Sequence, residues 1–229
     1  FEKFKGVSDH LGTQMRAVGE VMSIGKTYKE AFQKAIRSLE KGRYGLGYVK
    51  DYHDMSLDDL VALLVYPTSE RQFIMYEAIR KGADLDKLYE MTKIKKYFLE
   101  QMKELVDEEK EIAKSSHKNA SDEDFGARTP GVVPSDEILT KAKKDGFSDR
   151  YLAMICGVTE DQIREAREKI GVTEEWDAVH VSGTKDSCYY YSSYNIEPKK
   201  VEAPAADAKK KVMILGGGPN RIGQGIEFD

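Results

Sequence analysis

A succession of helix start signals constrains the fold of this chain more than any other feature. Ser, Thr or Asp can accept a hydrogen bond from a free N–H group in the first turn of a helix. Thr27 and Glu30 have the spacing of a capping box, and apolar residues follow at helical spacing until Gly42. Similar starts are expected at Ser56, Ser69, Asp84, Thr92, Ser135, Ser148 and Thr159. The sequence therefore predicts a mainly α-helical fold.

A polar stretch divides these predicted helices into two lobes. Residues 117–134 are rich in Ser, Asp, Gly and Pro, which favour loops. Three short helices after the loop are expected to end at Gly146, Gly157 and Gly171. Beyond Trp176 the residues favour extended chain, and Tyr189, Tyr190, Tyr191 and Tyr194 are expected to pack against a neighbouring lobe.

The last part of the sequence has a different character. Residues 196–210 form a linker rich in Pro, Ala and charge, and 211–215 form a short apolar run that predicts a β-strand. A glycine-rich loop follows, with Gly216, Gly217, Gly218, Gly223 and Gly225. The loop matches neither a P-loop nor a dinucleotide fingerprint, so a tight strand-to-helix turn and a phosphate contact both stay open. A lone strand of this kind predicts the opening of an α/β domain.

Composition excludes several classes of protein. The 229 residues are 40% hydrophobic and 33% charged, which suits a globular core of about one and a half domains. The net charge of −4 gives no basic excess for a phosphate backbone. Residues 149–169 nevertheless have helix-turn-helix spacing, so a DNA-binding module is the alternative hypothesis. Glu160 and Asp161 oppose it, because they begin the helix that would enter the groove.

Neither a membrane span nor a catalytic group is expected. The longest apolar runs, such as 61–66, are far shorter than a transmembrane helix, and the first residues carry neither Met nor a signal sequence. Cys156 and Cys188 suggest no disulfide framework, which favours a reducing compartment such as the cytoplasm. Neither cysteine has a histidine or a basic cluster beside it in sequence, which disfavours a reactive thiol. The histidines show no metal-ligand spacing.

Four segments together resemble the carbamoyl phosphate synthase large-chain family. They are LGTQMRAVGEVMSIGK at 11–26 with its continuation to 40, GFSDRYLAMICGVTEDQIREAREKIGV at 146–172, YYYSSY at 189–194, and KVMILGGGPNRIGQGIEFD at 211–229. The resemblance implies that residues 1–40 end a first ATP-grasp half and that 41–195 form a two-lobed helical oligomerisation domain. It also implies that a linker at 196–210 leads to a second synthetase half beginning at 211–229.

The resemblance implies the following about function. The parent enzyme would make carbamoyl phosphate from bicarbonate, glutamine-derived ammonia and two ATP, with Mg²⁺ or Mn²⁺ and a glutaminase small chain, for arginine and pyrimidine biosynthesis. This segment would hold no cofactor, metal or catalytic residue, would not be active alone, and would link the halves and self-associate. Glu20 and Glu227 match positions that line the tunnel for the carbamate intermediate. Residues 181–188 (VSGTKDSC) depart from the family pattern and form a connection several residues shorter than the one usual in the family.

Overall fold

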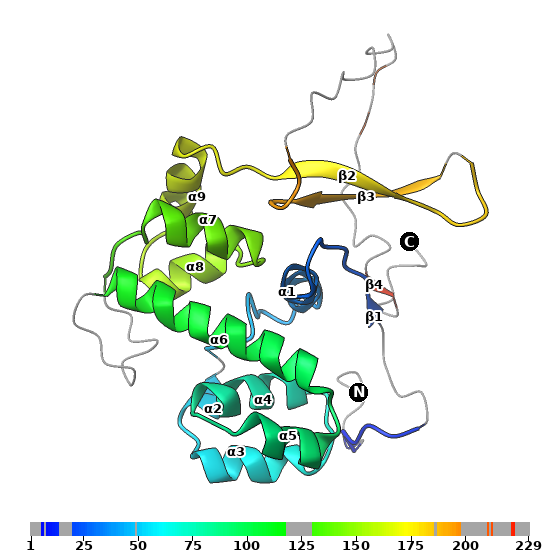
Figure 1. Ribbon diagram of the computed structural model, residues 1–229, viewed down its shortest axis with the longest axis vertical. Helices are drawn as coiled ribbons and strands as arrows, with labels where there is room; N and C mark the ends of the chain where they lie inside the picture. The colour runs from blue at the N-terminus through cyan, green and yellow to red at the C-terminus, as the bar shows by residue number, and fades with distance from the viewer. Residues whose placement is uncertain are drawn as a thin grey trace.

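The computed structural model in Figure 1 describes residues 6, 8–13, 20–48, 50–117, 130–185, 187–197, 210, 212 and 221–222. Helices dominate these residues, which confirms the predicted mainly α-helical fold. They are α1 (Tyr28–Ser38), α2 (Lys50–His53), α3 (Leu57–Leu64), α4 (Arg71–Arg80), α5 (Leu85–Thr92), α6 (Lys96–Ser116), α7 (Asp136–Lys144), α8 (Asp149–Cys156) and α9 (Glu160–Lys169). The strands are β1 (Glu20–Val21), β2 (Glu175–His180), β3 (Cys188–Ser193) and β4 (Arg221–Ile222).

The long helix α6 joins the two groups of helices. It packs against α4 and α5 on one side and against α7, α8 and α1 on the other, and it runs diagonally between them in Figure 1. Its buried apolar face includes Leu99, Met102, Leu105, Val106 and Ile112. These side chains belong to one continuous core that extends into both lobes. The two lobes therefore share a core along α6.

Most of the predicted helix starts are confirmed. In each case the side chain accepts a hydrogen bond from the N–H group of the third residue after it; these residues are Thr27, Ser56, Asp84, Ser135, Ser148 and Thr159. The reciprocal capping-box bond is present at Thr159, where Gln162 accepts from the cap N–H group. At Thr27 the predicted box is incomplete, because the Glu30 carboxylate accepts from the N–H group of Lys26 instead.

The predicted start at Ser69 is wrong. Helix α4 begins two positions later, and Glu70 precedes it without a side-chain cap bond. The Ser69 hydroxyl instead donates to the Asp9 carboxylate at 2.6 Å, and its backbone N–H group donates to the same carboxylate. Asp9, which is distant in sequence, therefore binds both the N–H group and the hydroxyl that Ser69 would use as a helix cap.

The predicted start at Thr92 is also wrong, because Thr92 is the last residue of α5. Its hydroxyl donates to the carbonyl of Leu88 at 2.7 Å and accepts from the N–H group of Ile94 at 3.2 Å. Lys93 then takes the left-handed conformation, with φ of 57°. Such local side-chain bonds compete with helix continuation, so α6 begins only at Lys96.

Strands β2 and β3 form an antiparallel hairpin, which confirms the predicted extended chain. Each residue from Glu175 to His180 is opposite one of β3, ending with the pair of His180 and Cys188. Two lysines, one in α1 and one just before it, hold the hairpin: Lys34 Nζ donates to the carbonyl of Ser192 at 2.5 Å, and Lys26 pairs with Asp177 at 2.8 Å. Figure 1 shows the hairpin extending past α1.

Several predictions fall outside the described residues. They concern 118–129 of the interlobe loop, 198–209 of the linker, the predicted strand at 211–215 apart from Val212, and the glycine-rich loop. The domain boundaries at 40, 195 and 210 stay predictions.

Candidate functional site

The predicted tunnel and loop residues are only partly described. Gly216, Gly217, Gly218, Gly223, Gly225 and Glu227 lie outside the described residues. The backbone of Glu20 lies in β1, which pairs antiparallel with β4. In this pair Glu20 is opposite Ile222, and Val21 is opposite Arg221. The pairing brings together two segments that the whole helical domain separates in sequence (Figure 1).

A buried carboxylate lies where the two lobes meet. Glu109 of α6 is fully buried, and its carboxylate accepts hydrogen bonds from the Tyr76 hydroxyl at 2.9 Å, the Tyr151 hydroxyl and the Arg80 guanidinium. The Tyr151 hydroxyl in turn accepts from the N–H group of Gly47 at 3.0 Å. Burial, followed by the charge of Glu109, raises the pKa of both tyrosines well above the usual value. Both therefore stay protonated as hydrogen-bond donors.

A second carboxylate extends this network within the first lobe. Glu77 of α4 is buried and lies 3.3 Å from Arg80 Nε and 3.5 Å from His53 Nδ1. Arg80 thus pairs with two buried carboxylates, Glu77 and Glu109. Removing one member of a buried ion pair costs about 3–5 kcal/mol, because the other charge is left uncompensated. The network therefore holds α2, α4, α6 and α8 in one arrangement.

Glycine is required where the chain passes this network. A Cβ atom on Gly47 would lie 2.5 Å from Arg80 Nη2 and 2.6 Å from a Glu109 oxygen. On Gly45 it would lie 2.2 Å from the ring of Tyr151. The two glycines of the sequence GLG at 45–47 let the backbone pass close to the Glu109 carboxylate. In this position the N–H group of Gly47 donates to the Tyr151 hydroxyl.

A separate charge cluster fixes α1 to the second lobe. Lys29 Nζ lies 2.8 Å from Asp145 and 3.2 Å from Glu104 of α6. Glu108 of α6 is buried beside Asp145, and neither of its oxygens has a hydrogen-bond partner of good geometry among the described residues. Burial, followed by the neighbouring Asp145, raises the pKa of Glu108 to about 8. Glu108 is therefore largely protonated in the folded chain at neutral pH.

The hairpin carries exposed apolar side chains. Tyr190 is 73% exposed and Trp176 is 64% exposed. Together with Met22 and Ile24 they line a groove of about 660 Å³. Tyr189 and Tyr190 do not pack against a neighbouring lobe as expected, because they are 49% and 73% exposed. They are consecutive residues of β3, so their side chains lie on opposite faces of the hairpin.

The other two tyrosines of this segment are held by the body of the domain. Lys143 Nζ lies 4.7 Å from the centre of the Tyr194 ring, and Lys26 Nζ lies 5.4 Å from that of Tyr191. Both rings therefore make cation–π contacts within the chain.

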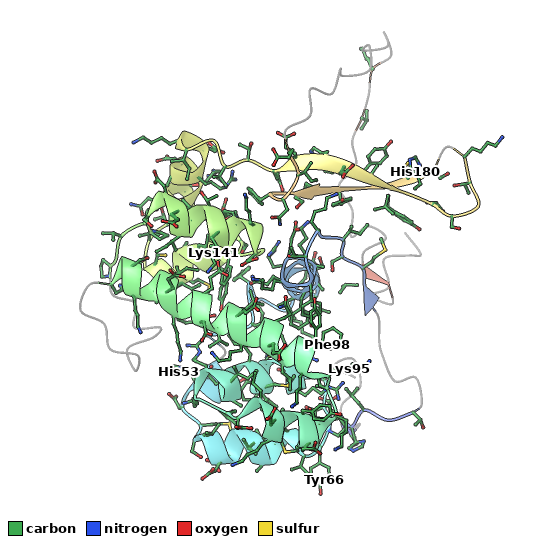
Figure 2. The ribbon with its side chains drawn as sticks, in the orientation of Figure 1. His53, Tyr66, Lys95, Phe98, Lys141 and His180 are labelled. Carbon is green, nitrogen blue, oxygen red and sulfur yellow. The ribbon has the colours of Figure 1, made fainter. Side chains whose placement is uncertain are left out.

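Further exposed aromatic residues lie on the helices. Tyr97 and Phe98 lie in the first turn of α6 and contact Tyr28 of α1, with ring centres 6.0 and 5.2 Å apart. Tyr66 is 66% exposed after α3. Figure 2 places Phe98 near the start of α6 and Tyr66 at the far end of the first lobe. Large apolar side chains at the surface are typical of interfaces.

The structure overturns the expectation that neither cysteine has a histidine beside it. Cys188 Sγ lies 3.2 Å from His180 Nδ1, at hydrogen-bond distance across the hairpin. Cys156 is different, because it is buried in α8 and burial raises its pKa to about 11. The separation of Cys188 and His180 by eight positions in sequence does not indicate that they are in contact. A prediction of the hairpin register would have indicated it, because the two residues are opposite one another.

The described residues include neither a membrane-spanning helix nor a cluster of metal ligands. None of these helices is long and apolar enough to cross a membrane. Within the same residues, no group of three or more His, Cys, Asp or Glu side chains could hold a metal ion.

Comparison with known proteins identifies the family. Residues 20–171 match the family model for the carbamoyl-phosphate synthetase large chain, oligomerisation domain. Carbamoyl phosphate synthase large chains of Archaeoglobus fulgidus and Pseudomonas aeruginosa are 41% and 39% identical over the whole of this chain, which covers 20% of each. The arginine-specific, chloroplastic large chain of Arabidopsis thaliana is 41% identical, and this chain covers 18% of it. The chain belongs to the carbamoyl phosphate synthase large-chain family and contains its oligomerisation domain.

Proposed function

We propose that this chain links the two synthetase halves of a carbamoyl phosphate synthase large chain and mediates its self-association. The observation that carries the linking role is the pairing of β1 with β4. Residues 20–21 and 221–222 lie side by side although the helical domain lies between them in sequence. In this proposal residues 1–40 end the first ATP-grasp half, 211–229 begin the second, and the network around Glu109 gives the connection between them a fixed shape.

Self-association is supported by the family and by the exposed apolar side chains. The matching family model is that of an oligomerisation domain. Trp176, Tyr190, Tyr97 and Tyr66 are each more than half exposed in the single chain. Burying such side chains against a second copy would remove apolar area from water, at about 25 cal/mol per Å². The proposed contact is therefore mainly apolar and only weakly dependent on salt.

The parent reaction belongs to the proposal as a whole. The parent would form carbamoyl phosphate from bicarbonate, ammonia released by a glutaminase small chain, and two ATP, for arginine and pyrimidine biosynthesis. Glu20 and Glu227 would line the tunnel for its carbamate intermediate. From the resemblance to the family, we assign ATP and the metal, Mg²⁺ or Mn²⁺, to other parts of the parent. The 229-residue chain alone would then be inactive, and bicarbonate-dependent ATP hydrolysis by it would contradict this.

The cellular location of the parent enzyme is also part of the proposal. Cys156 and Cys188 are free thiols, as in a reducing compartment. We place the protein in the cytoplasm, although the Arabidopsis relative is a chloroplast protein.

The DNA-binding alternative has less support. Both arginines of α9 are already paired within the chain: Arg164 with Asp161, and Arg167 with Asp149 at 2.8 Å. A recognition helix needs free cations and few acids at its N-terminal end. Binding to mixed-sequence duplex DNA that weakens steeply with salt would support that alternative instead.

A cross-linking experiment tests the linking role. In a chain with Cys156→Ser and Cys188→Ser, the substitutions Val21→Cys and Arg221→Cys place two thiols at directly opposed positions of β1 and β4. Mild oxidation is expected to close a disulfide, seen as faster migration on a non-reducing gel. Ser56→Cys with Arg221→Cys is the control and should stay open. Equal cross-linking of both pairs, or of neither, would contradict the pairing.

A further inference from the structure

The hairpin places a thiol and an imidazole in direct contact at the end of its ladder. His180 is the last residue of β2, Cys188 is the first of β3, and the two are register partners. Cys188 Sγ and His180 Nδ1 are 3.2 Å apart. Val181 N–H donates to the carbonyl of Ser187 at 2.9 Å, which closes the loop beside them. The ladder itself therefore sets the separation of the two side chains.

This contact has the arrangement of a nucleophile and its base. When sulfur holds the shared proton it donates to Nδ1, and when Nδ1 holds the proton the imidazolium donates to the thiolate. The thiolate is the reactive form of cysteine, and a neighbouring histidine favours it. His180, labelled on the hairpin in Figure 2, is exposed, so its ring can exchange protons with water. Cys188 is half-buried, which leaves the sulfur open to small molecules.

We propose that Cys188, assisted by His180, is a site of reversible thiol oxidation by hydroperoxides. In this step the sulfur attacks one peroxide oxygen, an S–O bond forms and the O–O bond breaks. The thiol proton passes to His180 Nδ1 and from there to the departing oxygen, which leaves as water when the oxidant is hydrogen peroxide. Sulfur loses an electron pair to the peroxide and becomes a sulfenic acid, which a second thiol can reduce.

Cys156, the other cysteine of the chain, is an internal control for the reactivity of Cys188. That thiol is fully buried in α8, and its pKa of about 11 keeps it as the unreactive thiol. Its reaction with a reagent therefore reports unfolding. Two cysteines in one chain can be followed in the same digest by mass spectrometry, because they lie in different peptides.

The first experiment compares the folded chain with the chain in denaturant, using hydrogen peroxide with a sulfenic-acid trap, and iodoacetamide in parallel. An unassisted cysteine is only a few per cent thiolate at pH 7, so assistance can raise the rate by about tenfold or more. Cys188 is expected to react at least that much faster in the folded chain, and Cys156 much more slowly. A Cys188 that reacts no faster when folded would overturn the proposal, and this comparison needs no variant.

The second experiment removes the base. His180→Asn keeps a polar side chain of similar length but cannot take the proton. Its Cys188 rate is expected to fall to that of the denatured chain, and the shape of its pH–rate profile should change. Lys185→Ala is the matched control, because it removes a cation from the same loop. A profile lowered by one constant factor at every pH, or an equal loss in Lys185→Ala, would contradict proton transfer to His180.

Discussion

Replacing Glu108 by Gln should change how the stability of the chain depends on pH. Glu108 is 3% exposed on α6, beside Asp145 of the second lobe and close to Lys29 and Lys141. Burial is the largest cause of its raised pKa, Asp145 raises it further, and the two lysines oppose the shift.

The direction of this pKa shift determines whether the chain gains or loses stability as the pH rises. The pKa rises from 4.5 to about 8 on folding, so the folded chain holds a proton that the unfolded chain releases. The contribution of Glu108 to stability is complete below pH 4.5 and is lost as pH rises to about 8. Each pH unit inside that window changes the free energy of unfolding by up to about 1.4 kcal/mol. Between pH 5 and pH 7.5 the wild type should therefore lose about 3 kcal/mol through this group.

Urea unfolding followed by circular dichroism measures this directly. Glu108→Gln is neutral at every pH, and its amide can donate to the Asp145 carboxylate. The free energy of unfolding of this variant, relative to that of the wild type, should rise by about 3 kcal/mol between pH 5 and pH 7.5. Glu100→Gln, at an exposed position of the same helix, should follow the wild type. Parallel stability curves for Glu108→Gln and the wild type would refute the assigned protonation.

Three further substitutions test the fold. Glu109→Ala should lower the free energy of unfolding by about 3–5 kcal/mol, because it leaves the buried Arg80 with Glu77 alone and takes the acceptor from two tyrosine hydroxyls; a loss below about 1 kcal/mol in urea unfolding would contradict the network. Gly47→Ala should cost at least about 1–3 kcal/mol by overpacking against Arg80 and Glu109, and an unchanged melting temperature would show that the contact is absent. Thr159→Ala should cost about 1 kcal/mol by removing the α9 cap, whereas a neutral result in chemical unfolding would show that the cap contributes nothing.

The helix starts could be predicted because their determinants are local. A Ser, Thr or Asp side chain bonds an N–H group only three residues away, so sequence spacing alone locates the cap at Ser56 or Thr159. The same reasoning failed at Ser69, because its partner is Asp9. It failed at Thr92 because the hydroxyl bonds the carbonyl of the preceding turn.

The interlobe network could not be predicted, because its members come from separate helices. Glu109 binds side chains of α4 and α8, and in the sequence it stands within the charged run DEEKE. Such a run usually indicates a solvated face. Helical spacing from Leu105 and Ile112 shows that position 109 lies on the buried side of α6, but only the fold shows which partners make burial of its charge possible.

The central claim is that this chain is an assembly domain, and its mass in solution tests that claim most directly. Light scattering coupled to size exclusion should give a mass above the 25.9 kDa of one chain, rising with concentration and changing little between low and high salt. Trp176→Ser and Tyr190→Ser would then show whether the hairpin contributes to the contact. A mass of one chain at every concentration up to the millimolar range would contradict the assembly role.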